Sequence, residues 1–313
     1  MSTKTKTKIN IEPKMNKVIA VVGPTASGKS SLAVQIARLV GGEVVSADSR
    51  QVYTGLDIGT GKVTKREMGG IPHHLLDVAN PKRKMSVVQY ERLATRAIQD
   101  ILKRGKVPVI CGGTGLYADA VLTTAVFPEV PPNSLLRKKL EKLSAETLFK
   151  KISKLDPVRA QTIDAKNPRR LIRAIEIALA LGKVPEPLTP RERYDTLWIG
   201  LNLPQEELLE RINTRLVSRL RRGMVAEARR LNEQGLSWKR MDSLGLEYRF
   251  LAQFLQNKTT KAEMLDLLNI AIRQYSKRQM VWFRKSENIN WFKPSDTKKI
   301  NQLVLRHLKL THP

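Results

Sequence analysis

Short, fully apolar runs alternate with amphipathic stretches in the first third of the chain. The runs KVIAVVG (17–23), EVVSA (43–47) and VPVICGG (107–113) are rich in β-branched residues, which predicts buried parallel strands. Between them, apolar positions at helical spacing predict helices over 30–40 and 86–105, the second closed by a glycine. This β-α-β-α-β order predicts an α/β fold with a doubly wound parallel sheet.

Two proline-rich breaks, 127–132 and 183–190, interrupt this pattern. Between the breaks only helical spacing occurs, over 134–143, 145–155 and 167–182. A strand-like run follows at 196–203, and from residue 205 the chain is mostly helical, with INWF (289–292) as a candidate last strand. We therefore predict a core from 17–126 and 191–313 with C-terminal helices, a helical insertion domain at 127–190, and a flexible basic tail at 1–16.

Composition excludes several classes of protein. The chain has 313 residues, of which 41% are hydrophobic and 27% charged, as in ordinary soluble proteins. It contains no apolar run near the roughly 20 residues that span a bilayer. A single cysteine, Cys111, excludes an internal disulfide and a cysteine-based zinc site. We expect a cytoplasmic protein without membrane attachment.

The net charge of +27 is the unusual property of the composition. Most of the excess lies in the middle and C-terminal parts of the chain. The basic residues repel one another and weaken the folded state, so a polyanionic partner explains the charge excess best. Nucleic acid is the favoured partner. A solvated basic surface and a membrane surface are the alternatives.

The segment GPTASGKS (23–30) fits the phosphate-loop pattern G-x-x-x-x-G-K-S/T, and it follows a predicted strand and opens a predicted helix. Gly23 and Gly28 permit unusual backbone angles, so that successive N–H groups can converge on anionic oxygens. Lys29 adds a positive charge and Ser30 offers a hydroxyl to Mg²⁺. The pattern predicts phosphate binding on a P-loop NTPase-like sheet, but it does not identify the rest of the ligand.

Asp48 follows the second predicted strand, so it should face the site beside the loop. It could bind magnesium through water, act as a general base toward a nucleophile, or only form a turn. The third strand ends in Cys111 and glycines rather than in an acid, which disfavours an NTPase. The glycines around Thr114 indicate close backbone approach to a ligand.

Several motifs together resemble the tRNA dimethylallyltransferases, also called tRNA isopentenyltransferases, of bacterial type. They are GPTASGKSSLA, SADSRQVYTGLDIGTGK, GIPHHLLD, GGTGLY, NPRRLIRAIE and RQYSKRQMVWFR, and the likeness runs from about residue 18 to 293. The resemblance implies that dimethylallyl diphosphate bound with Mg²⁺ donates its prenyl group to N6 of adenosine 37, just 3′ of the anticodon of tRNA. A P-loop small-molecule or nucleoside kinase and a non-catalytic RNA-binding protein are the alternatives. We expect a monomer that binds the anticodon stem-loop.

The resemblance also implies roles for single residues. Asp48 would be the general base, Thr25 would help the diphosphate to leave, and Arg215 would be the active-site arginine. The diphosphate-binding residues would be Gly23, Pro24, Thr25, Ala26, Ser27, Gly28, Lys29 and Ser30, with Ser30 also on the metal. The tRNA-binding residues would be Asp48, Ser49, Arg50, Gln51, Thr114, Arg137, Asn167, Pro168, Arg169, Arg170 and Leu171.

The sequence departs from the family at two places. GTGK (59–62) stands where GTAK is usual, and SLGLEY (243–248) replaces a stretch usually like IGYKE. The effect of Gly61 and of Leu246-Glu247-Tyr248 is therefore open.

Rows of basic residues recur on three predicted helices. Arg211, Arg215, Arg219 and Arg222 fall on one helix face, and no acid lies three or four residues from Arg215 or Arg219. Basic rows also occur at 273–284 and 169–173. We expect these faces to meet RNA.

Other chemically suggestive residues receive plain interpretations. We expect His73 and His74 to be structural or substrate-lining rather than metal ligands, although Asp77 lies nearby in the sequence. Cys111 should be a buried strand residue, and Trp282 and Phe283 should belong to the core.

Overall fold

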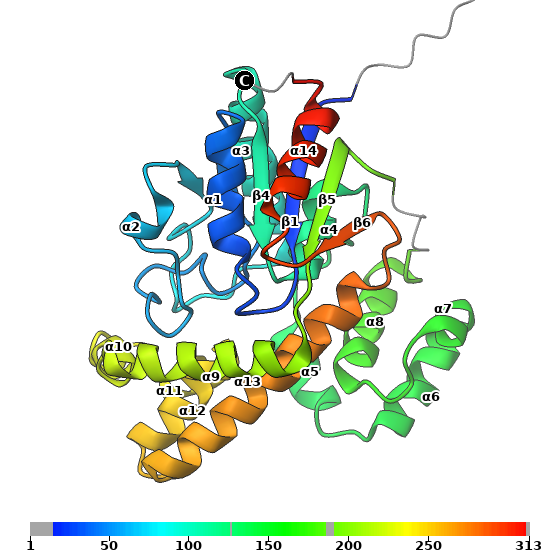
Figure 1. Cartoon of the computed structure of the whole chain (residues 1–313). Coiled ribbons are helices and arrows are strands. Elements are labelled where there is room, and N and C mark those ends of the chain that lie inside the picture. Colours follow the sequence, from blue (N-terminus) through cyan, green and yellow to red (C-terminus); the bar gives the residue numbers. More distant parts are fainter. Residues whose placement is uncertain (1–14, 126, 186–190, 311–313) are drawn as a thin grey trace, which may run out of the picture. The chain divides into compact units, whose positions relative to one another are not determined.

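The computed structural model describes residues 15–125, 127–185 and 191–310 (Figure 1). The chain forms two compact units, a core unit (Met1–Thr123 and Glu192–Pro313) and an insertion unit (Thr124–Arg191). The sequence placed the insertion at 127–190. Most of the expected basic tail and the end of the second proline-rich break lie outside the described residues.

The core unit is built on a six-stranded sheet in the order β3-β2-β4-β1-β5-β6. Every neighbouring pair is parallel, for example with Ala20 opposite Ile110 and Trp198. The strands are β1 (Lys17–Val22), β2 (Glu43–Ser46), β3 (His73–His74), β4 (Pro108–Gly112), β5 (Asp195–Leu201) and β6 (Ile289–Phe292). All but β3 come from predicted runs, so the predicted parallel sheet is confirmed.

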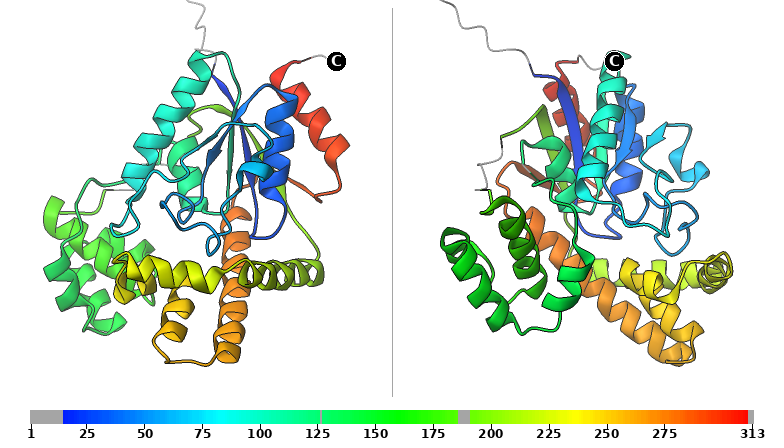
Figure 2. Two further views of the ribbon diagram at one scale, coloured as in Figure 1. Left: turned by 90° about the vertical axis from the view of Figure 1, so that its left-hand side faces the viewer. Right: turned by 180° about the vertical axis from the view of Figure 1, so that it is seen from behind.

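Helices cover both faces of the sheet, which makes the fold doubly wound as predicted (Figure 2). On one face, α1 (Lys29–Leu39) and α14 (Thr297–Leu308) bury their apolar sides against Ile19 and Ile199. On the other face lie α3 (Val87–Lys103) and α4 (Gly115–Leu122). α3 begins at a capping box in which Ser86 and Gln89 satisfy each other's backbone N–H groups.

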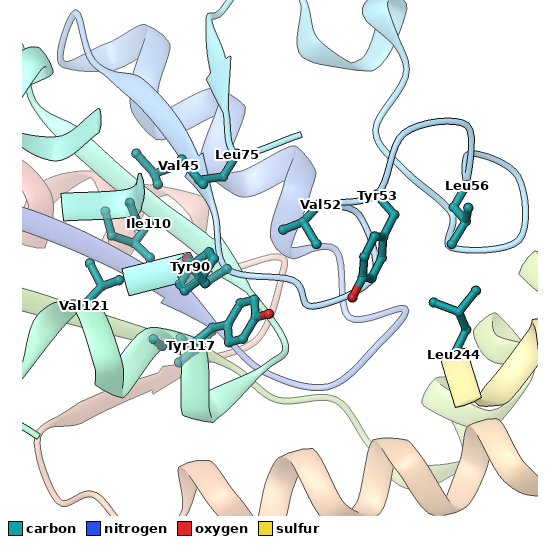
Figure 3. Packing of buried hydrophobic residues seen from close by; sticks show 14 of the residues in the cluster. Val45, Val52, Tyr53, Leu56, Leu75, Tyr90, Ile110, Tyr117, Val121 and Leu244 are labelled. Carbon is teal, nitrogen blue, oxygen red and sulfur yellow. The ribbon is translucent and has the colours of Figure 1, made fainter. Parts of the chain in front are cut away.

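The core on the α3 side extends beyond the sheet to the loop that follows β2 (Figure 3). The rings of Tyr90 and Tyr117 stack with centroids 3.8 Å apart. The Tyr90 hydroxyl donates to the Ser46 carbonyl oxygen at 2.9 Å. Tyr53 and Leu56, from the loop itself, are buried in the same cluster. Packing therefore fixes the loop that carries the motif SADSRQVYTGLDIGTGK (46–62), which we call the signature loop.

Further helices of the core unit follow β5 and lie beyond the sheet edge to which β1 points (Figures 1 and 2). They are α9 (Gln205–Arg221), α10 (Met224–Glu233), α11 (Trp238–Leu244), α12 (Leu246–Leu255) and α13 (Lys261–Phe283). A short α2 (Lys65–Met68) lies between β2 and β3 along the chain. Loops from the sheet and faces of these helices thus share one region of the core unit.

The insertion unit has a hydrophobic core of its own, which includes Leu148, Ile152 and Ile175. Its helices are α5 (Ser134–Leu140), α6 (Ala145–Leu155), α7 (Pro157–Thr162) and α8 (Pro168–Leu181). The sequence missed α7 because Pro157 suggests a break. Proline fits the first turn of a helix, however, and the Asp156 side chain caps this one.

Among the described residues, every helix is too short or too polar to cross a membrane.

Candidate active site

Three loops meet at the carboxyl edge of the sheet because β4 lies between β1 and β2. The Ala47 N–H donates to the Cys111 carbonyl oxygen at 2.8 Å, and the Thr114 N–H donates to the Ala47 carbonyl oxygen at 3.2 Å. A Cβ on Gly112 would overlap the backbone of Ala47, so only glycine fits there. The loops after β2 and β4 are therefore held in direct contact.

A cavity of about 80 Å³ lies at this edge. Residues that the sequence assigned to the active site line it together with residues that were not assigned to it. The predicted ones are Thr25, Lys29, Ser30, Asp48, Arg50, Gln51 and Arg215, and the others include Arg219, Glu247, Tyr275 and Gln279. The structure thus brings the phosphate loop, the acid after β2 and Arg215 to one place.

The phosphate loop has the backbone that its glycines predict. Gly23 and Gly28 have φ angles of 140° and 92°, which other residues rarely adopt. The Ser27 hydroxyl donates to the Pro24 carbonyl oxygen at 2.9 Å, and the Lys29 ammonium donates to the same oxygen. α1 begins directly after Gly28, with no side-chain cap and no acid in its first turn. Its first N–H groups are therefore available to an anion.

Lys29 sits in an environment that disfavours its charge. Surrounding protein atoms exclude water from the ammonium, and this desolvation lowers the pKa of Lys29 to about 8. Arg215 lowers this pKa further, whereas Asp48 acts in the opposite direction. An anionic ligand at the loop would restore a favourable environment for the charge.

One oxygen of the Asp48 carboxylate is engaged in a turn. Its Oδ1 accepts from the backbone N–H of Arg50 at 2.8 Å and of Gln51 at 3.4 Å. Within the described part of the chain, Oδ2 receives no hydrogen bond. The turn-forming role therefore leaves Oδ2 available to a ligand, a metal-bound water or a proton.

Thr114 holds the segment next to Asp48. Its hydroxyl accepts from the Ser49 N–H at 3.1 Å and lies 3.3 Å from the Ser49 hydroxyl oxygen. Thr114 therefore fixes the loop after β2, whether or not it also meets a ligand.

The predicted row of RNA-facing arginines on α9 is wrong at Arg219. This side chain is buried, and it donates to the Gly59 carbonyl oxygen at 2.9 Å and to Glu247 at 2.8 Å. The sequence test counted acids only within the helix, whereas Glu247 comes from α12. Arg215 is exposed to solvent and donates to the Gly61 carbonyl oxygen at 2.9 Å, and Arg211 pairs with Glu207.

A larger cavity of about 1020 Å³ shares Lys29, Ser30, Arg215 and Arg219 with the smaller one. It is lined by α1, the segment 61–69 and α9. The additional cations in its wall are Arg38, Lys62, Arg66, Arg211 and Arg222. The phosphate loop therefore opens onto a second, strongly basic space.

Sequence reasoning missed the residues that hold the 57–62 part of the signature loop. The buried Glu227 carboxylate accepts from the N–H groups of Asp57, Ile58 and Gly59 at 2.7–3.0 Å, and from the Tyr248 hydroxyl at 2.7 Å. Its partners in the loop lie 168–170 residues away along the chain, so no local pattern could have indicated them. Proximity to Glu227 and, above all, burial hold the pKa of Tyr248 well above its usual value.

Lys62 closes the other end of this loop. Its ammonium donates to the Tyr53 carbonyl oxygen at 2.9 Å and pairs with Asp57 and Asp77. Asp77 is thus an ion-pair partner rather than a metal ligand. The departures at Glu247 and Tyr248 are likewise parts of the network that fastens the loop to the C-terminal helices.

In the insertion unit, some of the predicted tRNA-binding residues are buried or paired within the protein, and the others are exposed. Leu171 is fully buried (0% exposed), so the predicted contact of its side chain with tRNA is wrong. Arg137 pairs with buried Glu176, and the Asn167 side chain accepts from the Arg170 N–H as the cap of α8. Pro168, Arg169 and Arg170 are exposed, and their contact with tRNA stays a prediction.

His73 and His74 make structural hydrogen bonds, and Cys111 is a buried residue of β4 as predicted. His74 bonds to Glu43 at 2.7 Å, and His73 bonds to the Ile71 carbonyl oxygen at 2.8 Å. No cluster of three potential metal ligands among His, Cys, Asp and Glu occurs within the described ranges. Burial raises the pKa of Cys111 to about 11, so it is a thiol rather than a nucleophile at neutral pH.

The two aromatic residues at the end of α13 differ. Phe283 is buried as predicted, but Trp282 is 36% exposed and donates to Asp119 at 2.9 Å. Trp282 packs so closely over Gly115 that a Cβ there would overlap the indole ring. The prediction that Trp282 belongs to the core is therefore wrong.

Comparisons with known proteins agree on one family. The family model of the IPP transferases matches residues 51–286. The tRNA dimethylallyltransferase of Anoxybacillus flavithermus is 39% identical over 297 residues, covering 92% of this chain and 95% of that protein. The tRNA dimethylallyltransferase 2 of Treponema denticola is 42% identical over 292 residues, covering 90% and 97%.

Solved structures agree. The tRNA isopentenylpyrophosphate transferase of Bacillus halodurans superposes with a TM-score of 0.72 at 35% identity, covering 94% of this chain and 97% of that one. A eukaryotic dimethylallyltransferase described as acting on tRNA gives a TM-score of 0.77 at 26% identity, covering 93% and 78%. The matched residues include the loop 57–62 and the whole of α9 and α13. These relatives are named tRNA dimethylallyltransferases or tRNA isopentenylpyrophosphate transferases, and the chain therefore belongs to the IPP transferase family.

Proposed function

We propose that this protein transfers a dimethylallyl group from dimethylallyl diphosphate to N6 of adenosine 37 in tRNA and releases diphosphate. The names of its relatives support this reaction over the kinase alternative. The observation that carries the proposal is the shared cavity of the phosphate loop and Asp48, at a sheet edge where β4 ends in glycine and not in an acid.

The phosphate loop would hold the diphosphate of the donor. The N–H groups at the start of α1 have no side-chain cap, and Lys29 and Thr25 line the same cavity, so an anion bound there would meet both the helix N-terminus and the ammonium. Negative charge grows on the diphosphate as its bond to the allylic carbon breaks. Fixed donors placed where that charge grows lower the barrier.

Asp48 would act on the acceptor side. As N6 bonds to the allylic carbon, the C–O bond to diphosphate breaks and its electron pair stays with the leaving oxygen. The proton that N6 loses passes to a base, and Asp48 Oδ2 is the carboxylate oxygen that the turn leaves free. An aromatic amine is a weak nucleophile, so alignment with the donor matters as much as the base.

The oxygen atoms near the phosphate loop fit Mg²⁺, which prefers oxygen ligands and binds through few protein groups together with phosphates and waters. The Ser30 hydroxyl would hold the ion, and Asp48 lines the same cavity and could reach it through water. When bound, Mg²⁺ would neutralise part of the charge of the diphosphate.

A stacked anticodon-loop base must leave the stack to reach this cavity. Half-buried Arg50 and Gln51 and exposed Arg215 line the cavity in which such a base would be read. The exposed Arg169 and Arg170 would meet the backbone of the tRNA. Residues on the donor side and on the acceptor side both come from one chain, so we propose that the protein acts as a monomer. We propose that it acts in the cytoplasm.

Transfer is tested with the purified protein, Mg²⁺, dimethylallyl diphosphate and unmodified tRNA, followed by digestion and mass analysis of the nucleosides. We expect an adenosine heavier by one dimethylallyl group with the wild type, and at least a 100-fold lower rate with Asp48→Asn. Asp266→Asn, at an exposed aspartate of α13 that does not line the cavity, is the control. Transfer of the γ-phosphate of ATP to a small molecule, without any gain in adenosine mass, would instead support the kinase.

A further inference from the structure

Gln279 on α13 bridges two of the loops that form the cavity. Its side-chain oxygen accepts from the Thr25 N–H at 2.8 Å, and its side-chain nitrogen donates to the Gly113 carbonyl oxygen at 2.8 Å. The side chain is buried, with 6% exposed. Both polar ends of one amide are thus used, one on the phosphate loop and one on the loop after β4.

The loop after β4 is shaped to receive this amide. A Cβ on Gly113 would overlap the Gln279 side-chain nitrogen, whereas the φ angle of Gly113 is negative and open to any residue. Glycine is required here by the close approach of Gln279 and not by backbone strain. α13 is also held to α4, the helix that begins directly after this loop, because the Trp282 indole N–H donates to the Asp119 carboxylate.

The bridge continues to the acceptor side through Thr114. Thr114 follows Gly113 directly, and its hydroxyl accepts from the Ser49 N–H beside Asp48. An unbroken series of hydrogen bonds and peptide units therefore joins Thr25, through Gln279 and Thr114, to Asp48. Thr25 lies on the donor side and Asp48 on the acceptor side of the proposed reaction.

We propose that Gln279 is a positioning residue that holds the phosphate loop at a fixed distance from the loop carrying Asp48. It acts through the backbone of Thr25 and Gly113 and not by binding tRNA. The role rests on the proposed function, because prenyl transfer requires the loop that holds the diphosphate and the loop that carries the base to stay in register. A misplacement of about 1 Å between reacting groups is enough to cost about 100-fold in rate.

The first test measures the bridge itself and does not depend on activity. Hydrogen exchange of peptides that contain Thr25 and Gly113 is compared between the wild type, Gln279→Ala and Gln274→Ala. Gln274 is the matched control, a glutamine exposed on the same helix. We expect at least tenfold faster exchange at both loops in Gln279→Ala only. Equal exchange in all three proteins would overturn the bridge, whatever reaction the protein catalyses.

The second test separates positioning from stability by single-turnover transfer at saturating tRNA and donor. Gln279→Ala should lower the rate by about 100-fold, with tRNA affinity within twofold of the wild type. Gln279→Glu keeps the acceptor for Thr25 but loses the donor to Gly113. Its rate relative to the wild type should therefore recover as pH falls and the new carboxyl gains a proton.

A rate loss in Gln279→Glu that stays constant with pH would contradict the bridging role, as would a loss confined to tRNA affinity. If the wild type transfers no prenyl group while the exchange result holds, the bridge stands and the proposed function fails. If Gln279→Ala does not fold, Gln279→Glu carries both tests.

Discussion

At the scale of single residues, Lys29 makes donor binding depend on pH. Its pKa is lowered to about 8 in the free protein, chiefly by desolvation, and bound diphosphate would raise it again. The protonated form is therefore the one that binds. The contribution of Lys29 to the affinity for inorganic diphosphate should be nearly constant below pH 8. Above pH 8 the affinity should fall by up to tenfold per pH unit.

Calorimetric titration with diphosphate from pH 7 to 9.5 measures this dependence. Lys29→Met should bind more weakly at pH 7 and lose the decrease above pH 8. Lys29→Arg, which stays charged throughout this range, should lose the decrease while keeping part of the affinity. A decrease that persists unchanged in Lys29→Met would assign it to another group.

The sequence predicted residues whose chemistry is local and missed those whose partners are distant. Lys29 and Ser30 belong to a contiguous pattern, and Asp48 directly follows an apolar strand. Gln279 acts on Thr25 at a separation of 254 residues, and nothing in its neighbourhood distinguishes it from exposed Gln274. Burial and partners, not residue type, decide the role of a glutamine on a long helix.

At the scale of elements, the loop that carries the family signature depends on Glu227 of α10. Three successive N–H groups of the loop and the Tyr248 hydroxyl converge on this buried carboxylate. Glu227→Gln would place an amide nitrogen, itself a donor, against these donors. Leaving buried groups unpaired costs about 1–3 kcal/mol each, so we expect a loss of about 2–4 kcal/mol in the free energy of unfolding.

Urea unfolding of Glu227→Gln and Glu233→Gln measures this loss. Glu233 is exposed on the same helix and should change stability by less than about 0.5 kcal/mol. Equal stability of the two variants would mean that packing of Tyr53 and Leu56 alone holds the loop.

Elements marked by an apolar run or by helical periodicity were predicted well, whereas the strand defined only by its pairing was not. β6 was predicted at its observed bounds because INWF is an isolated apolar run between polar residues. β3 has two histidines and no alternation, and only its pairing with β2 makes it a strand. The α9 arginines also show the limit of a helix-only test, since the partner of Arg219 lies on α12.

At the scale of the whole molecule, the net charge of +27 predicts binding to tRNA that depends strongly on salt. The proline-rich breaks indicated a separate helical unit, and the structure gives that unit its own core. The sequence could not tell which of its arginines are free. Arg137 is paired with Glu176, and Arg173 donates to the carbonyl oxygens of Pro128 and Val130.

Arg169 and Arg170 are the exposed arginines at the start of α8, and we expect them to contact phosphates of the tRNA. Each lost contact should make the slope of log K against log salt less steep by about 0.7–0.9. The double variant Arg169→Ala/Arg170→Ala should therefore bind tRNA more weakly at low salt, with a slope less steep by about 1.5. Because neither residue touches the cavity, transfer at saturating tRNA should stay within about twofold of the wild type.

Filter binding of unmodified tRNA at several salt concentrations measures the slope. Arg306→Ala, at an exposed arginine of α14 outside every site described above, is the control and should leave the slope unchanged. If both variants reduce the slope equally, the tRNA senses the overall charge of the molecule and not a defined surface of the insertion unit. If only the α8 variant reduces it, the insertion unit contributes specific phosphate contacts, and its excess of basic residues is explained by the substrate.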